Sequence, residues 1–293
     1  MLLTELPHYL ENQYSKLTTA GRSNADVIID FTSQSQIQQA LNTIQPDVII
    51  NAIAYTAVDK AEAEQDSAYQ INAELPAVLA NWCAENNSVL IHYSTDFVFD
   101  GSGTDAYKEH DETGPLSVYG ESKLAGELAI QRSSATSIIL RTSWVYGETG
   151  NNFMRTMQRL ARERESLGIV ADQRGTPTYS RHLAILTFDI IKAYQAKPEH
   201  FQGQQVVYHA SAAGQTTWHG FATTIFKKMR EYEAIKVNDV KAIATTDYPT
   251  PATRPENSVL SSDKLFSELG ISMPDWQEGL TEAMCRAYAD DGA

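Results

Sequence analysis

Short apolar runs rich in β-branched residues alternate with segments of helical periodicity through the first two-thirds of the sequence. The runs that predict strands are Lys16–Thr19, Val27–Asp30, Asp47–Asn51, Val89–Thr95 and Ser137–Thr142. The segments between them that predict helices are Ser33–Ile44, Asp66–Asn86 and Ser117–Gln131. Several of the runs are almost wholly apolar, as in strands that helices cover on both faces. This order predicts an α/β fold with a doubly wound parallel sheet.

The pattern becomes less regular after Trp144. The later segments are a helix near Asn152–Glu165, a short strand and turn at Ala171–Pro177, a helix at Arg181–Ala196, and further strands and helices from Val206 onward. No linker rich in Gly and Ser divides the chain. We therefore expect a sheet domain made of residues 1–145 plus 178–204, and a smaller C-terminal α/β cap made of residues 146–177 plus 205–293.

Charge and composition exclude several functional classes. The chain has 23 Lys and Arg against 37 Asp and Glu, a formal net charge of −14, so it repels nucleic-acid backbones and anionic membrane surfaces. It has no signal peptide pattern and no apolar run near the ~20 residues of a membrane-spanning helix. Cys83 and Cys285 lack neighbours at metal-ligand spacing, so we predict no zinc site and name no metal ligands. We expect a cytoplasmic protein with reduced thiols, one disulfide being the alternative.

Tyr119 and Lys123 are the most informative pair of side chains. On a helix, residues four apart lie on one face, one turn from each other. A lysine ammonium beside a phenol lowers the phenol pKa from about 10, so the tyrosine could donate a proton to a substrate oxygen near neutral pH. Carbonyl reduction also requires a hydride, which no side chain supplies. The pair therefore implies a nicotinamide cofactor.

Context distinguishes this pair from Tyr232 and Lys236, which have the same spacing in a polar stretch typical of a solvated helix. Tyr119 follows, by one loop, the strand that ends at Thr95, and parallel sheets bind ligands at the carboxyl ends of their strands. The hydroxyl of Thr95 or of Ser94 could bond the same carbonyl oxygen; only one points into the cleft, because strand side chains alternate. The chain has no G-x-S-x-G or H-E-x-x-H motif, which argues against hydrolase and zinc-protease chemistry.

Longer motifs carry a family resemblance. They are Asn51–Ala80, Ile91–Gly101, Pro115–Glu127, Leu140–Met157, Thr245–Leu265 and Pro274–Leu280. These stretches resemble the dTDP-4-dehydrorhamnose reductase family of the extended short-chain dehydrogenase/reductase superfamily, from about Asp26 onward. The resemblance implies a Rossmann-type dinucleotide-binding domain, a substrate-binding cap, and reduction of dTDP-4-dehydro-L-rhamnose to dTDP-L-rhamnose by NADPH or NADH. The oligomeric state, a homodimer included, and any divalent metal stay open.

The resemblance also implies roles for individual residues. Thr95, Tyr119 and Lys123 would be catalytic, with Tyr119 as the proton donor and Lys123 holding the nicotinamide ribose. The other cofactor contacts would be Asp30, Phe31, Ala52, Ala54, Tyr55, Thr142 and Ser143. The nucleotide sugar would contact Thr56, Val58, Asp96, Trp144, Asn152, Arg254 and Asn257. Arg254 suits the diphosphate, because a guanidinium bonds phosphate oxygens in pairs.

The sequence departs from the family pattern at its start. The family begins with a strand and a Gly-rich turn that cradles the cofactor pyrophosphate, whereas Met1–Leu10 matches the helix after that turn. We expect a sheet without this first strand, either because the start is internal to a longer protein or because the chain is short and binds cofactor weakly. Phe97 replaces a usual Tyr, and Gly21 is followed by Arg22 rather than by the acid that selects NAD, which favours NADPH.

Two alternatives to reduction stay open. A non-catalytic regulatory subunit, like the related beta subunit of methionine adenosyltransferase, would suit a chain without the phosphate turn. An epimerase or dehydratase would use the same scaffold with further acid and base residues. Dehydration is disfavoured because Asp96 is followed by Phe97, not by the Glu that dehydratases pair with it.

Overall fold

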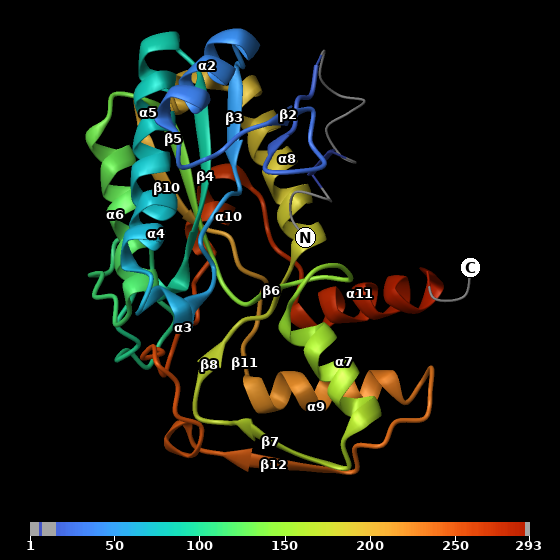
Figure 1. Ribbon diagram of the computed structural model, residues 1–293. Coiled ribbons are helices and arrows are strands. Elements are labelled where there is room, and N and C mark those ends of the chain that lie inside the picture. Colours follow the sequence, from blue (N-terminus) through green and yellow to red (C-terminus); the bar gives the residue numbers. More distant parts are fainter. Residues whose placement is uncertain (1–5, 8–15, 291–293) are drawn as a thin grey trace.

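The structure is a computed structural model that describes residues 6–7 and 16–290. Its centre is a four-stranded sheet with the order β10-β5-β4-β3 (Figure 1), and all its neighbours are parallel. The strands are β3 (Val48–Asn51), β4 (Val89–Thr95), β5 (Thr136–Thr142) and β10 (Gln205–His209). Every residue of β4 is buried. The predicted α/β class with a parallel sheet is confirmed.

Two short strands form a separate parallel pair, β1 (Ala20–Gly21) and β2 (Val27–Ile28). The predicted strand Lys16–Thr19 is wrong, because β1 begins only after it. The Asp26 carboxylate accepts hydrogen bonds from the N–H and the hydroxyl of Thr19, each at 2.8 Å, so a side chain takes the place of a strand partner. The segment Met1–Leu10, expected to match a helix, lies outside the described residues except for Leu6 and Pro7.

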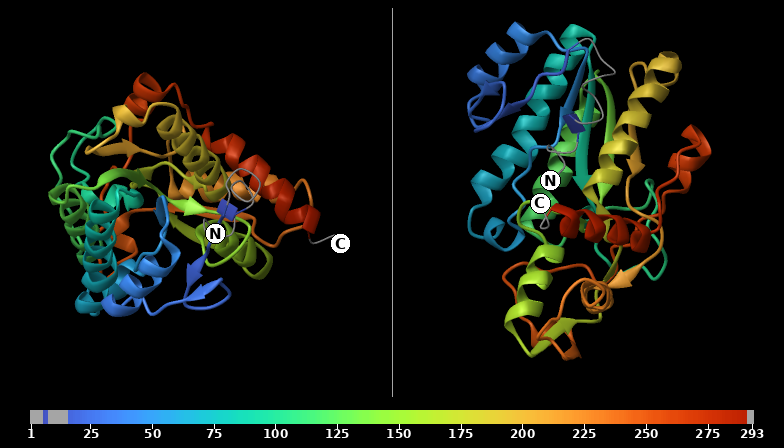
Figure 2. Two further views of the ribbon diagram at one scale, coloured as in Figure 1. Left: turned by 90° about the horizontal axis from the view of Figure 1, so that it is seen from above. Right: turned by 90° about the vertical axis from the view of Figure 1, so that its right-hand side faces the viewer.

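Helices cover both faces of the larger sheet and give three layers (Figure 2). One face carries α2 (Gln34–Ile44), α5 (Leu75–Asn86) and α6 (Val118–Arg132), which share an apolar core with β4 and β5. The other face carries α8 (Ser180–Ala196) and α10 (Asp263–Leu269), which share a second core with the same strands. The helices predicted at Ser33–Ile44 and Ser117–Gln131 are confirmed as α2 and α6, each capped by the side chain of its Ser.

The helix predicted at Asp66–Asn86 consists of three pieces. It begins as α4 (Gln65–Tyr69), passes through a π-helical turn η1 (Gln70–Glu74), and continues as α5. Such π turns are frequent at functional sites. The other short helical elements of the described chain are α3 (Val58–Ala61), η2 (Asp96–Val98), η3 (Pro198–His200) and η4 (Thr245–Asp247).

The cap forms the lower half of the molecule in Figure 1. Its helices are α7 (Phe153–Glu163), α9 (Trp218–Met229) and α11 (Trp276–Asp290), which share a third core. Its strand pairs are β7 (Ser166–Val170) with β12 (Asp239–Ile243), β8 (Arg174–Gly175) with β11 (Thr216–Thr217), and β6 (Val145–Tyr146) with β9 (Thr178–Tyr179). The short strand predicted within Ala171–Pro177 is present as β8, and the longer β7 before it was not predicted.

The structure corrects the predicted boundary between sheet domain and cap. We placed residues 205–293 in the cap, but β10 pairs along its whole length with β5 in the large sheet. Leu265 of α10 is fully buried in the core of the sheet, against α8. β10 and α10 therefore belong to the sheet domain, and the intervening segment with β11, α9 and β12 belongs to the cap.

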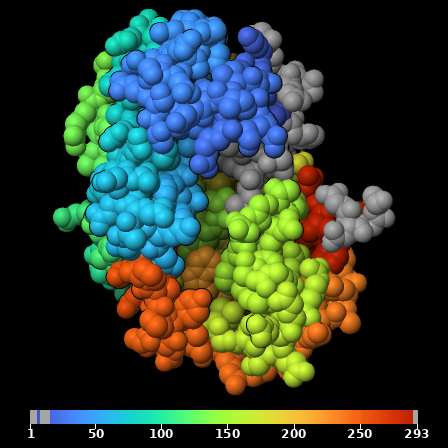
Figure 3. Space-filling view, in the orientation of Figure 1, coloured from blue at the N-terminus to red at the C-terminus, as the bar shows by residue number. Residues whose placement is uncertain are grey.

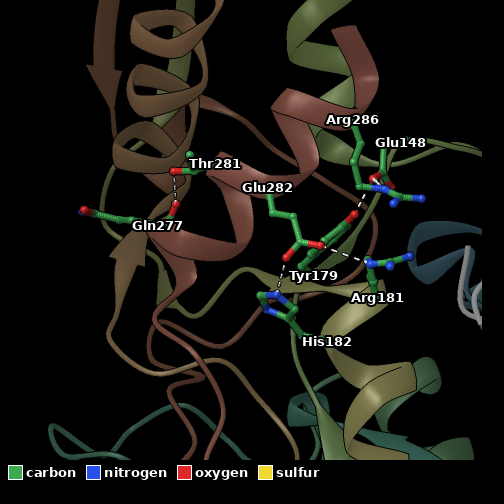
Figure 4. A network of polar contacts seen from close by, with 8 residues as sticks. All are labelled: Glu148, Tyr179, Arg181, His182, Gln277, Thr281, Glu282 and Arg286. Carbon is green, nitrogen blue, oxygen red and sulfur yellow. Dashed lines mark hydrogen bonds and ion pairs between the residues drawn. The ribbon is translucent and has the colours of Figure 1, made fainter. Parts of the chain in front are cut away.

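Polar contacts fasten α11 across the junction of the two parts (Figure 4). Glu148, in the loop after β6, accepts hydrogen bonds from Tyr179 and from Arg286 Nε, the latter at 2.9 Å. Glu282 of α11 contacts Nε2 of His182, in the first turn of α8, at 3.0 Å. The C-terminal helix is thereby tied to both the cap and the sheet domain.

No helix among the described residues is long and apolar enough to cross a membrane. Cys83 is buried and Cys285 is exposed, and both are free thiols; burial raises the pKa of Cys83 to about 12. Within residues 6–7 and 16–290, His, Cys, Asp and Glu side chains do not gather into a group of three that could hold a metal ion.

Helix α6 lies unusually close to its neighbours. A Cβ on Gly126 would lie 2.1 Å from the carbonyl oxygen of Asn72, so only glycine allows this approach to η1. One residue further, Glu127 forms a buried ion pair with Arg141 of β5, at 2.7 Å between Oε2 and Nη2 and 3.0 Å between Oε1 and Nε. Both side chains are at most 5% exposed. This pair fastens α6 to the sheet in one register.

We expect Gly126→Ala to lower the free energy of unfolding by about 1–3 kcal/mol, because the added methyl group forces α6 away from η1. Urea denaturation measures this. Gly114→Ala is the matched control, since its Cβ would meet only Asp100 Cβ, at an ordinary 3.4 Å. A Gly126→Ala protein as stable as the control would contradict this account of the packing of α6.

Candidate active site

Three neighbouring strands end at one edge of the sheet, β3 at Asn51, β4 at Thr95 and β5 at Thr142. The space-filling view shows a hollow between the segment around residues 55–75 and the cap segment around residues 145–165 (Figure 3). Both segments follow these strands in the chain. The hollow therefore lies where a parallel sheet is expected to bind its ligand.

Thr95 and Tyr119 meet at this edge. The Thr95 side chain lies close enough to Tyr119 to lower its pKa, and Thr95 Oγ1 donates to Asp96 Oδ1 at 3.0 Å. Tyr119 reaches this point from the first turn of α6. The sequence left Ser94 and Thr95 as alternatives, and Thr95 is the one beside Tyr119.

The pKa of Tyr119 shifts opposite to the expected direction. We expected the Lys123 ammonium to lower it, but burial raises the pKa of Tyr119 to about 12, with a further upward contribution from the Asp96 carboxylate. The hydroxyl therefore keeps its proton at neutral pH, which suits a proton donor. Lys123 is 1% exposed, and its Nζ donates to the carbonyl oxygen of Tyr93 at 2.6 Å. Burial lowers the pKa of Lys123 to about 8.

Two buried hydroxyls at the ends of β4 and β5 have no hydrogen-bond partner within the described chain, Ser94 Oγ and Thr142 Oγ1. An unpaired buried polar group costs about 1–3 kcal/mol, and such groups occur where a ligand completes the site. Asp96 is 2% exposed, and burial raises its pKa to about 6. The edge thus offers polar atoms that a bound molecule could satisfy.

The residues predicted for the cofactor lie in three places. Asp30, exposed after β2, accepts hydrogen bonds from the N–H and hydroxyl of Thr32, and Phe31 packs on the core beside it. The loop after β3 contains Ala52, Ala54 and Tyr55, all partly buried. Ser143 is buried, and its hydroxyl donates to the carbonyl oxygen of Thr176 at 2.8 Å.

Asn72 holds the loop after β3, and sequence reasoning missed it. Its Oδ1 accepts from Tyr55 N at 2.8 Å, and its Nδ2 donates to Tyr55 O at 3.1 Å and to Ser122 Oγ at 3.0 Å. It is fully buried in the π-helical turn. The only signal in the sequence was a polar residue at a core position of a helix.

Trp144 forms part of an aromatic wall between the sheet and the cap. Its φ of 44° is in the left-handed region, and its ring stacks on Trp218 with centroids 3.5 Å apart. The ring lies directly over Gly175, where a Cβ would be 2.4 Å from Trp144 Cε2. The ring is therefore held in one place and is half-buried.

Arg254 forms an ion pair with Asp59 of α3, at 2.8 Å between Nη2 and Oδ2. The pair joins the Pro-rich cap loop to the sheet domain, and the Arg254 side chain holds the pKa of Asp59 below its ordinary value. Thr56 is exposed and Val58 half-buried just before Asp59. The structure thus brings these three predicted substrate residues, Arg254, Thr56 and Val58, to one side of the molecule.

Two residues predicted to contact the substrate, Asn257 and Asn152, have amides that bond within the chain, and their substrate contacts stay predictions. Asn257 is 2% exposed, and its Nδ2 donates to the carbonyl oxygens of Gly103 and Asp105, at 2.9 and 2.8 Å. Asn152 caps α7, with Oδ1 accepting from Arg155 N at 3.2 Å and Nδ2 donating to nearby carbonyls. Both amides are engaged within loops, because Asn mimics a backbone turn or cap as readily as it binds a ligand.

Comparisons with known proteins identify relatives along almost the whole chain. A family model described as RmlD substrate binding domain matches residues 1–289. A dTDP-4-dehydrorhamnose reductase of Shigella flexneri is 44% identical over 258 residues, which are 88% of this chain and 85% of that protein. A dTDP-4-dehydrorhamnose reductase of Escherichia coli K12 is 43% identical over 258 residues, which are again 88% of this chain and 85% of that protein.

A solved structure is also similar. The crystal structure of dTDP-4-dehydrorhamnose reductase from Bacillus anthracis in complex with NADP has a TM-score of 0.82 and 34% identity to this chain. The match covers 96% of this chain and 95% of that one. It supports the Rossmann-type arrangement of the sheet.

We expect Asn257→Ala to lower the free energy of unfolding by about 1–3 kcal/mol, because it removes the two hydrogen bonds that the buried Asn257 amide makes to the loop of Gly103 and Asp105. Chemical denaturation measures this, and calorimetry measures binding of dTDP to the same protein, which we expect to be unchanged. The control is Asn81→Ala on the exposed face of α5, with an expected effect within about 0.5 kcal/mol. Unchanged stability together with weaker dTDP binding would favour the predicted substrate contact of Asn257 over a structural role.

Proposed function

The chain belongs to the RmlD substrate binding domain family, and we propose that it reduces dTDP-4-dehydro-L-rhamnose to dTDP-L-rhamnose with NADPH, using Thr95, Tyr119 and Lys123 at the reacting carbonyl. It is an oxidoreductase of dTDP-rhamnose biosynthesis, like the relatives that are 44% and 43% identical to it. The observation that carries the assignment of residues is the meeting of Thr95 and Tyr119 at the carboxyl edge of the sheet.

The site suits a nicotinamide cofactor, which supplies the hydride when bound. The unpartnered hydroxyl of Thr142, the register neighbour of Thr95, would gain a partner from a polar ligand at the end of β5. The loop Ala52–Tyr55 would lie along it, fixed by Asn72. Arg22 is exposed directly after β1 and suits the extra phosphate of NADPH, which is our reason for preferring NADPH to NADH.

Tyr119 would act as the general acid. Its hydroxyl retains a proton at neutral pH, because burial raises its pKa to about 12. As the carbonyl carbon of the sugar receives the hydride, the proton passes from Tyr119 Oη to the carbonyl oxygen, which leaves an alcohol and a tyrosine phenolate. Thr95 Oγ1, beside Tyr119, would bond the same oxygen and hold it in line. Lys123 lies one turn further along α6 and would contact the cofactor ribose.

The cap would bind the nucleotide sugar. The half-buried ring of Trp144 faces the junction and would pack against the sugar, with Asp96, Thr56 and Val58 lining the same space. Arg254 would leave Asp59 and bind the diphosphate, because two phosphate charges outweigh one carboxylate. The division of labour between a cofactor-binding sheet and a substrate-binding cap is part of this proposal.

We expect Tyr119→Phe to reduce turnover at least about 10²-fold, the usual contribution of a general acid, while dTDP binding stays the same. The assay follows NADPH oxidation with dTDP-4-dehydro-L-rhamnose. Tyr232→Phe is the matched control, because it removes the hydroxyl of a tyrosine that also lies four residues before a lysine and it should keep full turnover. Normal turnover by Tyr119→Phe would refute the assignment.

Two variants with opposite effects test the diphosphate site. Arg254→Gln should weaken dTDP binding about 10- to 100-fold, the value of charge-assisted hydrogen bonds to phosphate. Asp59→Asn should strengthen dTDP binding several-fold at low salt, because it frees Arg254 from its partner. Calorimetric titration measures both, with Arg159→Gln, from a surface ion pair, as the control. If the parent chain and the three variants all bind dTDP with equal affinity, the diphosphate binds elsewhere.

A further inference from the structure

A buried histidine lies beside the proposed catalytic lysine. His92 is in the middle of β4, among apolar residues, and is 1% exposed. Its Nε2 is 3.3 Å from Lys123 Nζ, and its Nδ1 is 3.0 Å from Asn51 Nδ2. The three side chains thus form a line that runs from the end of β3, through β4, to α6. The chemistry proposed above uses only the last of them.

The backbone at Ile53 determines the direction of the hydrogen bonds along these three side chains. The backbone N–H of Ile53 can only donate, and it lies 3.1 Å from Asn51 Oδ1. The oxygen of the Asn51 amide therefore faces Ile53, and its NH₂ group faces His92. Because an NH₂ group only donates, Nδ1 of His92 must be the acceptor.

The remaining nitrogen of His92 must then carry the proton. Burial holds the pKa of His92 well below its ordinary value, so the ring is neutral and has one donor and one acceptor. With Nδ1 accepting from Asn51, the Nε2–H bond points toward Lys123 Nζ. An ammonium group has no lone pair to accept this bond, whereas an uncharged amine does.

We propose that Asn51 and His92 are positioning residues that present the Nε2–H bond of His92 to Lys123 and thereby favour the uncharged amine of Lys123. The amine can accept from Nε2–H and still donate to Tyr93 O, 2.6 Å away. The inference rests on the proposed function for its importance in catalysis, because Lys123 belongs to the proposed site. Its structural content, the position of one proton on His92, is independent of any reaction.

The surroundings of Lys123 shift its pKa in both directions. Burial lowers its pKa to about 8, and the Glu127 carboxylate on the next turn of α6 opposes this shift. Glu127 is itself paired with Arg141 of β5, which reduces its effect. On the β3 side the line ends in the neutral amide of Asn51. The Nε2–H donor therefore acts in the same direction as burial.

Nuclear magnetic resonance of the ¹⁵N-labelled chain tests the position of the proton. Long-range ¹H–¹⁵N spectra distinguish protonated from unprotonated ring nitrogens, and the His92 signals are those lost in His92→Gln among the seven histidines. We expect a proton on Nε2 and a free lone pair on Nδ1 at and above pH 8, where the uncharged amine of Lys123 is populated. A proton on Nδ1 would overturn the inference.

Asn51→Asp should reverse the direction of the hydrogen bonds between residue 51, His92 and Lys123. A carboxylate can accept from both Ile53 N–H and Nδ1–H, so the proton of His92 should move to Nδ1 and Nε2 should accept from the Lys123 ammonium. We expect the Lys123 titration, followed through its ¹³Cε signal, to move up by about one pH unit, a tenfold change in proton affinity. Asn81→Asp, which adds the same charge at an exposed site, should move neither signal.

The outcomes separate this inference from the proposed function. If the Lys123 titration rises while the proton stays on Nε2, the carboxylate acts through charge alone and the inference fails. If the parent chain shows the expected Nε2 proton but reduces no substrate, the proposed function fails and the inference stands. If the parent chain reduces the substrate but carries the His92 proton on Nδ1, the inference fails and the proposed function stands. Circular dichroism of each variant confirms that it is folded.

Discussion

The rest of the site depends on how helix α6 packs against the sheet. Gly126 brings the helix against the carbonyl oxygen of Asn72, where a single methyl group would not fit. Glu127 then pairs with Arg141 of β5 in an interior where neither charge meets water. Breaking a buried ion pair strongly destabilises a protein, so this pair opposes sliding or rotation of α6. Tyr119 and Lys123 are carried by this helix, so their positions follow from it.

The same buried setting explains how the site differs from an ordinary core. Along α6 and the π-helical turn, the buried polar atoms of the side chains have hydrogen-bond partners, as in the bonds of Asn72 to both backbone groups of Tyr55. At the strand ends, Ser94 and Thr142 have hydroxyls without partners in the described residues. The satisfied contacts give rigidity, and the unsatisfied ones leave room for a ligand. A reductase needs both, because hydride and proton must reach one carbonyl in a fixed geometry.

The sequence was informative where local chemistry determines structure. The strand Val89–Thr95 and the helix containing Tyr119 and Lys123 were predicted closely, since apolar content, helical periodicity and capping by Ser117 agree there. The pairing of β10 with β5 was missed because it joins residues 68 positions apart, such as Gln205 and Ser137, which no local pattern reports. The engagement of Asn257 within its loop was missed because an amide suits a turn or a ligand equally well. His92 could have been noticed as the one imidazole in an otherwise apolar strand segment, but its partners lie on two other elements.

The central claim is that this chain transfers hydride to a sugar carbonyl while α6 supplies the proton. The most direct measurement uses NADPH carrying two deuterium atoms at C4 of the nicotinamide, with dTDP-4-dehydro-L-rhamnose as the substrate. Nuclear magnetic resonance of the product then shows where the deuterium goes. The account predicts one deuterium on C4 of the sugar in every product molecule. A product without deuterium at that carbon, or deuterium at another carbon of the sugar, would contradict it.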